Sequence, residues 1–135
     1  MKNFLIAILI LFLLLISFVM AMVKIQNNVA PIKMNDVIVT AYCPCKICNL
    51  HWAGWLATGH SMKAILIEKK NICAVDPKVI PMGSQVIYNG IIYWALDVGS
   101  KIKGKHIDIF LKNHKATRKF GIKHNETILV KRNIK

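Results

Sequence analysis

The sequence predicts a mainly β protein, a small six-stranded barrel with one short helix, preceded by an N-terminal transmembrane helix. Three observations predict this fold class. A single long apolar segment opens the chain. Short runs rich in Ile, Val and aromatic residues then recur between Gly, Pro and Asn, which is typical of strands. Only one later stretch has a helical pattern, and short strands with so little helix indicate a closed barrel.

The apolar segment covers residues 4–23, and its only polar residue is Ser17. It is long enough to cross a bilayer. Val19 and Ala21 also form a small-residue pattern that would allow cleavage after Ala21. We therefore interpret residues 1–24 as a signal anchor or a signal peptide, and the length of the run favours an uncleaved anchor.

Asn27, Asn28 and Pro31 indicate a linker over residues 25–35 before the barrel domain at 36–131, and residues 132–135 form a basic tail. Asn89-Gly90 between two apolar pairs predicts a hairpin turn. Asn113 and Gly121 suit the two ends of the one helix. The six predicted strands are residues 36–42, 71–75, 85–88, 91–96, 105–111 and 126–130.

Charge is strongly one-sided, with nineteen Lys and Arg against six Asp and Glu and a net charge of +13. Such an excess indicates an anionic partner. The lysines are scattered through loops and strands and form no basic helix, so we expect no nucleic acid partner. The sequence contains no signal for an oligomeric state.

Asp76, Asp97 and Asp108 each end or interrupt an apolar, strand-like run in a chain with little acid. A carboxylate in such a run costs free energy unless it is paired, protonated or used in chemistry. Each could also simply cap a turn, as Asp does beside Pro and Gly. Three together predict a carboxylate cluster.

The stretches 74–84 and 97–110, which contain the three aspartates, resemble the core of the 3D domain, a family named for three aspartates. Thr40-Ala41-Tyr42 and Ala57-Thr58-Gly59 resemble two further stretches of that family. The family is similar to the catalytic part of the lytic transglycosylase MltA. Ser100 departs from the pattern where a second glycine is usual, as do Leu56 and His60 where threonines are common.

The resemblance implies a double-psi β-barrel with an internal pseudo-twofold, which the short repeat of residues 74–76 in 95–97 weakly supports. It also implies a peptidoglycan lytic transglycosylase, which cleaves glycan strands and leaves 1,6-anhydro-muramyl ends. The partner would be peptidoglycan glycan strands, with the barrel on the extracytoplasmic side of the cell membrane, or secreted to the wall after cleavage. No cofactor and no metal are expected.

Asp108 is the expected catalytic acid, because burial between Ile107 and Ile109 would raise its pKa. It also matches the family position of that acid. Asp97 and Asp76 are expected either to tune Asp108, to orient a sugar hydroxyl, or only to hold loops. A metal site built from the three carboxylates is the weaker alternative.

Substrate contacts are expected from four residues near these acids, namely Thr58, Gly59, Gly99 and Lys103. Trp52 and Trp55 could stack on a sugar ring, although packing of their loop onto the barrel is favoured. A non-catalytic wall-binding barrel is the alternative function.

Four cysteines, Cys43, Cys45, Cys48 and Cys73, provide a separate signal. In an exported small domain they predict two disulfides. A zinc site is the second interpretation and free thiols are the third, so an exported zinc- or thiol-based protein remains a further alternative. The five histidines have no metal-ligand spacing, and only His106 is expected near Asp108.

Overall fold

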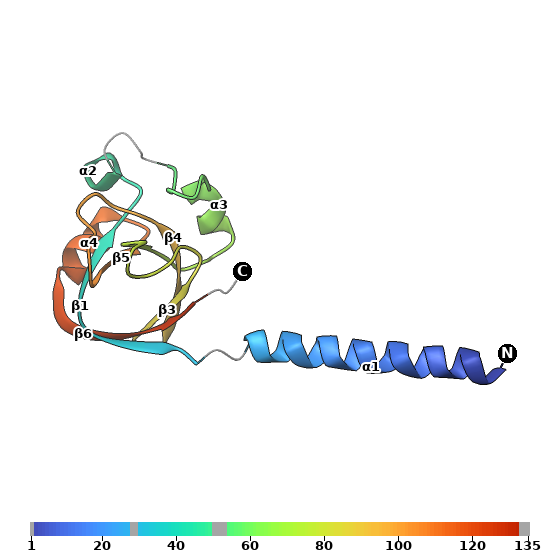
Figure 1. Cartoon of the computed structure of the whole chain (residues 1–135). Coiled ribbons are helices and arrows are strands. Elements are labelled where there is room, and N and C mark those ends of the chain that lie inside the picture. The colour runs from blue at the N-terminus through green and yellow to red at the C-terminus, as the bar shows by residue number, and fades with distance from the viewer. Residues whose placement is uncertain (1, 28–29, 50–53, 133–135) are drawn as a thin grey trace. The chain divides into compact units, whose positions relative to one another are not determined.

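The computed structural model describes residues 2–27, 30–49 and 54–132. It divides into two units, Met1–Ala30 and Pro31–Asn133. The first unit contains the helix α1, Lys2–Asn27 (Figure 1). Within α1, Phe4–Met22 is long and apolar enough to cross a membrane by length and composition, as an anchor or a signal sequence would be.

The second unit is a closed barrel of six strands, which confirms the predicted fold class. Its strands follow one another around the barrel in the order β1-β5-β2-β4-β3-β6. Their bounds are β1 Ile32–Tyr42, β2 Ile72–Val75, β3 Gln85–Tyr88, β4 Ile91–Asp97, β5 His106–Phe110 and β6 Lys123–Lys131.

The connectivity of the barrel has the internal pseudo-twofold that the resemblance implied. The symmetry appears when three is added to each strand number and counting continues from β6 to β1. This converts the parallel pair β1–β5 into the parallel pair β4–β2, and the antiparallel pair β1–β6 into the antiparallel pair β4–β3. The pairs β2–β5 and β3–β6 map onto themselves. The short repeat seen in the sequence does not reflect this symmetry, because it joins β2 and β4, which are parallel neighbours.

Two strands begin several residues before their predicted starts. β1 begins at Ile32 and β6 at Lys123, and the two pair antiparallel from Ile32 opposite Val130 to Val39 opposite Lys123. Asp36 has a positive φ of 58° where this pairing shifts register. The first strand thus starts within the residues expected to form a linker, because the partner strand is long enough to pair with them.

Local sequence patterns correctly predicted one hairpin turn and one helix. Asn89 and Gly90 have φ values of 49° and 76°, as the hairpin turn requires. Helix α4, His114–Phe120, begins after Asn113, whose Oδ1 accepts a hydrogen bond from the amide of Ala116 at 2.9 Å. The short helices α2, Lys46–Asn49, and α3, Met62–Ile67, were not predicted.

Apolar side chains form two clusters on opposite sides of the strands. The inner cluster fills the barrel with residues from all six strands, such as Val39, Val75 and Ile107. The outer cluster joins the outward faces of β1, β2 and β5 to the segment 54–67, through residues such as Leu56 and Met62. Tertiary packing of this kind explains how a helix as short as α3 is stable.

Candidate active site

Asp108 lies in the middle of β5 on the outer face of the barrel. Its neighbours Ile107 and Ile109 point into the inner cluster, so the carboxyl points the opposite way, as strand alternation predicts. β1 runs parallel to β5 and places Thr40 opposite Asp108. The Thr40 hydroxyl donates a hydrogen bond to Asp108 Oδ1 at 2.7 Å.

Thr40 also links Asp108 to a histidine. Nε2 of His106 lies 3.0 Å from Thr40 Oγ1. Because Thr40 has a single hydroxyl hydrogen, which it gives to Asp108, His106 donates in this contact. The three side chains therefore form a chain of hydrogen bonds that ends at the carboxyl, with His106 where the sequence placed it.

Burial raises the pKa of Asp108 above its ordinary value. The hydrogen bond from Thr40 and the charge of His106 oppose that rise, whereas the negative charge of Asp97 adds to it. The net direction is upward, as expected for an acid that must keep its proton.

Asp97, the last residue of β4, reaches the same face through an irregularity in strand pairing. Strict alternation would place its side chain with Tyr93 and Ala95 in the inner cluster. The pairing of β2 with β4 shifts by one residue after Cys73, so that Asp97 lies opposite Ala74. Bulges that redirect a side chain are common beside active sites.

The Asp97 carboxylate accepts three hydrogen bonds. The Tyr42 hydroxyl donates to Oδ2 at 2.8 Å, and the amides of Ala57 and Val98 both donate to Oδ1 at 2.9 Å. Burial, followed by the charge of Asp97, raises the pKa of Tyr42 far above its ordinary value, so Tyr42 remains a donor. Asp97 therefore holds the loop at Ala57 against the barrel.

Ala74 on β2 separates the two acids. It is the register partner of Asp108 on one side and of Asp97 on the other. Neighbouring strands are about 4.8 Å apart, so the two aspartate Cα atoms lie roughly 10 Å apart across a methyl group. Ala74 is itself buried in the outer cluster, which also contains Tyr42 and Leu56.

Asp76 makes the contacts of a loop-holding carboxylate. The amide of Lys78 donates to its Oδ1 at 3.1 Å, and the amide of Gly104 donates to Oδ2 at 2.8 Å. These backbone bonds lower the pKa of Asp76, with a smaller contribution from the charge of Lys103. The carboxylate fastens the turn after β2 to the loop before β5.

The four expected substrate-contacting residues lie in two loops. Thr58 is next to Ala57, and its hydroxyl donates to the Leu96 carbonyl at 3.0 Å, while exposed Gly59 turns the chain with a φ of 79°. Gly99 packs against Ile102 of its own loop instead of being open, because a Cβ there would lie 2.7 Å from Ile102 Cγ1. Exposed Lys103 lies near Asp76.

The departures from the family pattern at Leu56 and His60 have visible consequences. Leu56 is buried in the outer cluster and anchors the loop. His60 Nδ1 lies 3.0 Å from Thr58 Oγ1. Trp55 is 60% exposed, so the packing role favoured for it is wrong; Trp52 lies outside the described residues.

The structure does not contain the predicted disulfides. All four cysteines lie among the described residues and none is in a disulfide. Cys73 faces the inner cluster because it alternates with Ala74, so it cannot join the other three. Cys43, Cys45 and Cys48 instead group with His114, and the four ligand atoms lie within 4.8 Å of one another.

Sequence reasoning missed three residues of these sites. Thr40 and Tyr42 were noted only as part of a family motif, and their even spacing on one strand was the signal that both share the outer face. His114 was set aside because its partners lie almost seventy residues earlier in the chain, a distance that no local spacing rule detects.

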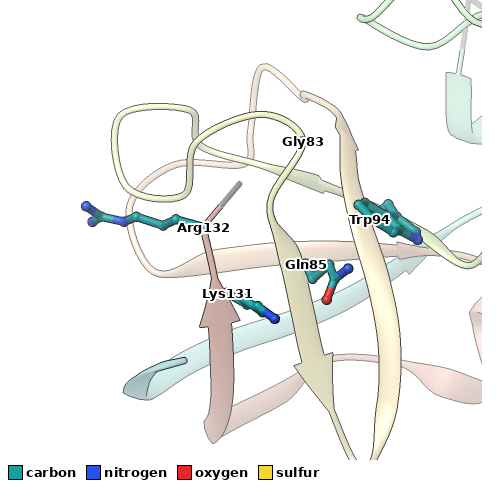
Figure 2. Close-up of a pocket in the computed structure, with 5 residues that line it drawn as sticks. All are labelled: Gly83, Gln85, Trp94, Lys131 and Arg132. Atoms are coloured by element: carbon teal, nitrogen blue, oxygen red, sulfur yellow. The ribbon is translucent and has the colours of Figure 1, made fainter. Parts of the chain in front are cut away.

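A small pocket lies on another part of the barrel. Figure 2 shows Gln85, Trp94 and Lys131, which come from three neighbouring strands, together with Gly83 and Arg132. It offers an aromatic ring and two cations, and none of the three aspartates lines it.

Comparison with known proteins identifies the domain. Residues 71–131 match the model of the 3D domain. Two similar proteins of Bacillus subtilis (strain 168) are the SPbeta prophage-derived uncharacterized protein YorM, 34% identical over 104 residues, and the putative cell wall shaping protein YabE, 37% identical over 108. The matches cover 73% and 78% of this chain.

The chain spans only 43% of YorM and 24% of YabE. The cell wall-binding protein YocH of the same organism is 42% identical over 53 residues, which are 38% of this chain and 18% of YocH. The matched region contains β2 to β6 and all three aspartates. Residues 71–131 of this chain therefore form a 3D domain.

Proposed function

We propose that this protein is a peptidoglycan lytic transglycosylase in which Asp108 is the catalytic acid. The observation that carries the proposal is the environment of that carboxyl, which is partly buried, has a raised pKa and has Thr40 on one oxygen. Asp97 accepts three donors and is thereby committed to holding the loop and supplying negative charge.

One acid suffices for this reaction. Asp108 gives its proton to the glycosidic oxygen as the bond from C1 to that oxygen breaks. The resulting carboxylate, stabilised by the Thr40 hydroxyl, then accepts the proton of the sugar's own 6-hydroxyl. The 6-oxygen bonds to C1 and closes a 1,6-anhydro ring. The reaction therefore uses no water and needs no second carboxylate.

The positions of the other residues support this assignment. Asp108 and Asp97 both lie on the outer face, on the strands that flank Ala74. Thr58 and Gly59 are exposed in the loop that Asp97 holds, and exposed Lys103 lies near Asp76. The names of YabE and YocH, which refer to the cell wall, and the similarity of the 3D domain to MltA support the same substrate.

A series of Asp→Asn variants tests the proposal, using purified peptidoglycan and mass spectrometry of the released muropeptides. Asp108→Asn cannot transfer a proton and should lose at least about 10²–10⁴-fold in rate. Asp97→Asn and Asp76→Asn should be less affected. Asp36→Asn is the matched control, because Asp36 is exposed on β1 and Asn tolerates its positive φ.

The alternative is a barrel that binds the wall without cutting it. The pocket of Trp94 with Lys131 favours this function, since an aromatic ring and a cation suit a sugar bearing a carboxylate (Figure 2). Under this alternative no variant, and not the wild type either, releases anhydro-muropeptides. Trp94→Ala should then weaken wall binding, whereas Asp108→Asn should not.

We propose that α1 keeps the protein in the cell membrane with the barrel outside. Its apolar run, Phe4–Met22, carries no strong cleavage signal. The protein should remain with membranes after a high-salt wash. A soluble form that begins at Met22 would show that α1 is a signal peptide.

A further inference from the structure

We propose that Cys43, Cys45, Cys48 and His114 bind one structural Zn²⁺ ion. Cys43 directly follows β1, Cys45 lies in the turn before α2, Cys48 lies in α2, and His114 is the first residue of α4. Together they supply three sulfurs and one imidazole nitrogen. Such a set is a standard tetrahedral zinc environment.

Four distances between ligand atoms are close to the edges of a tetrahedron, and the Cys43–Cys45 pair is the most compressed. With Zn–S near 2.3 Å and Zn–N near 2.0–2.1 Å, the edges are about 3.8 Å between sulfurs and about 3.5 Å from sulfur to nitrogen. Cys43 Sγ lies 3.2 Å from Cys45 Sγ and 3.6 Å from Cys48 Sγ. His114 Nδ1 lies 3.6 Å from Cys45 Sγ and 3.4 Å from Cys48 Sγ. A disulfide would need sulfurs about 2.05 Å apart and would leave the imidazole without a role.

Lysines beside the ligands in the sequence would balance the negative charge of a zinc–thiolate complex. Three thiolates, one neutral imidazole and Zn²⁺ carry a net charge of −1. Lys46 lies between two of the cysteines, Lys115 follows His114, and Lys112 precedes the helix. Binding forms three Zn–S bonds and one Zn–N bond, releases the thiol protons to solvent and moves no electrons.

The metal would connect the segments that frame the active site. Cys43 directly follows Tyr42, whose hydroxyl donates to Asp97, and the Leu111 amide donates to the Tyr42 carbonyl at 2.7 Å. Cys48 packs against the outer cluster, which contains Leu56 from the loop that Asp97 holds. With four protein ligands the site is closed, so the metal stabilises and takes no part in the reaction.

The test uses the full-length protein, purified in detergent with reductant, exposed to excess Zn²⁺ and then dialysed. Elemental analysis should find one zinc per chain. Cys45→Ser and His114→Ala should lose the metal. The matched controls Cys73→Ala, from the inner cluster, and His124→Ala, exposed on β6, should keep it.

Cobalt provides a second measurement on the wild type, should a variant fail to fold. Co²⁺ in this site should show thiolate charge-transfer bands and the intense visible bands of a tetrahedral ion. A wild type that retains no zinc, or that holds copper or iron instead, overturns the proposal. So does equal zinc in Cys45→Ser, His114→Ala and wild type, or a disulfide between two of the three cysteines in protein isolated without reductant.

Discussion

At the scale of single residues, the two outer-face acids of the barrel differ in their hydrogen-bond partners. Asp108 meets one hydroxyl, whereas Asp97 meets a phenol and two amides. Under the proposed function, these environments suit Asp108 to proton transfer and Asp97 to positioning and charge. Placing two carboxyls in different environments is a common way in which enzymes give them different roles.

Thr40 should set the pH range of activity. Asp108 must be protonated to act, so activity falls as pH rises through its pKa. The Thr40 hydroxyl favours the ionised form and lowers that pKa. Thr40→Val removes the donor and keeps the shape, so the alkaline limb of the pH–rate profile should move to higher pH.

The pH profile of anhydro-muropeptide release checks this expectation. Thr127→Val is the control, because exposed Thr127 bonds only to Asn35 among the described residues and should leave the limb in place. An unchanged limb in Thr40→Val, or a shift to lower pH, contradicts the role given to Thr40.

At the scale of elements, the site depends on two features that break regular strand structure. The register shift between β2 and β4 brings Asp97 to the outer face. The loop after β4 turns back through Gly99, whose carbonyl accepts from the Ile102 amide at 3.1 Å. The register shift places a carboxylate, and the turn at Gly99 places a loop, where a regular strand would not.

Gly99 should be required for packing. A Cβ there would lie 2.7 Å from Ile102 Cγ1, and Ile102 is buried in the outer cluster. Gly99→Ala should lower the free energy of unfolding by about 1–3 kcal/mol, the usual cost of overpacking. Urea unfolding of the wild type and the variant measures it.

A double-mutant cycle separates this clash from other effects. Ile102→Ala removes the atom that the new methyl group would meet. Gly99→Ala should therefore cost less in the Ile102→Ala background than in the wild type. An equal cost in both backgrounds would show that the contact is not the reason for the glycine.

At the scale of the whole molecule, the sequence predicted the class of fold but not how its parts combine. Strand number, the Asn89 turn and the cap at Asn113 were predicted because each depends on local chemistry. The helix α3 was not, because it is stabilised by Met62 and Ile65 packing onto distant strands. Cys73 was grouped with the other cysteines because only the barrel shows that it faces inward.

The candidate site was predicted to a similar degree. Strand alternation correctly predicted that Asp108 points outward and that its neighbours Ile107 and Ile109 are buried. It could not give the position of Asp97, which depends on a register shift, or the partnership with Thr40, which depends on the parallel pairing of β1 with β5. Long-range pairing is the information that sequence patterns lack.

The central claim is that this barrel cuts glycan strands with Asp108 as the only acid. The most direct measurement is mass spectrometry of purified peptidoglycan after incubation with wild type and with Asp108→Asn. The account predicts muropeptides with 1,6-anhydro ends from the wild type and essentially none from the variant. Products with reducing ends, no products at all, or a variant that retains more than about a tenth of the wild-type rate would contradict it.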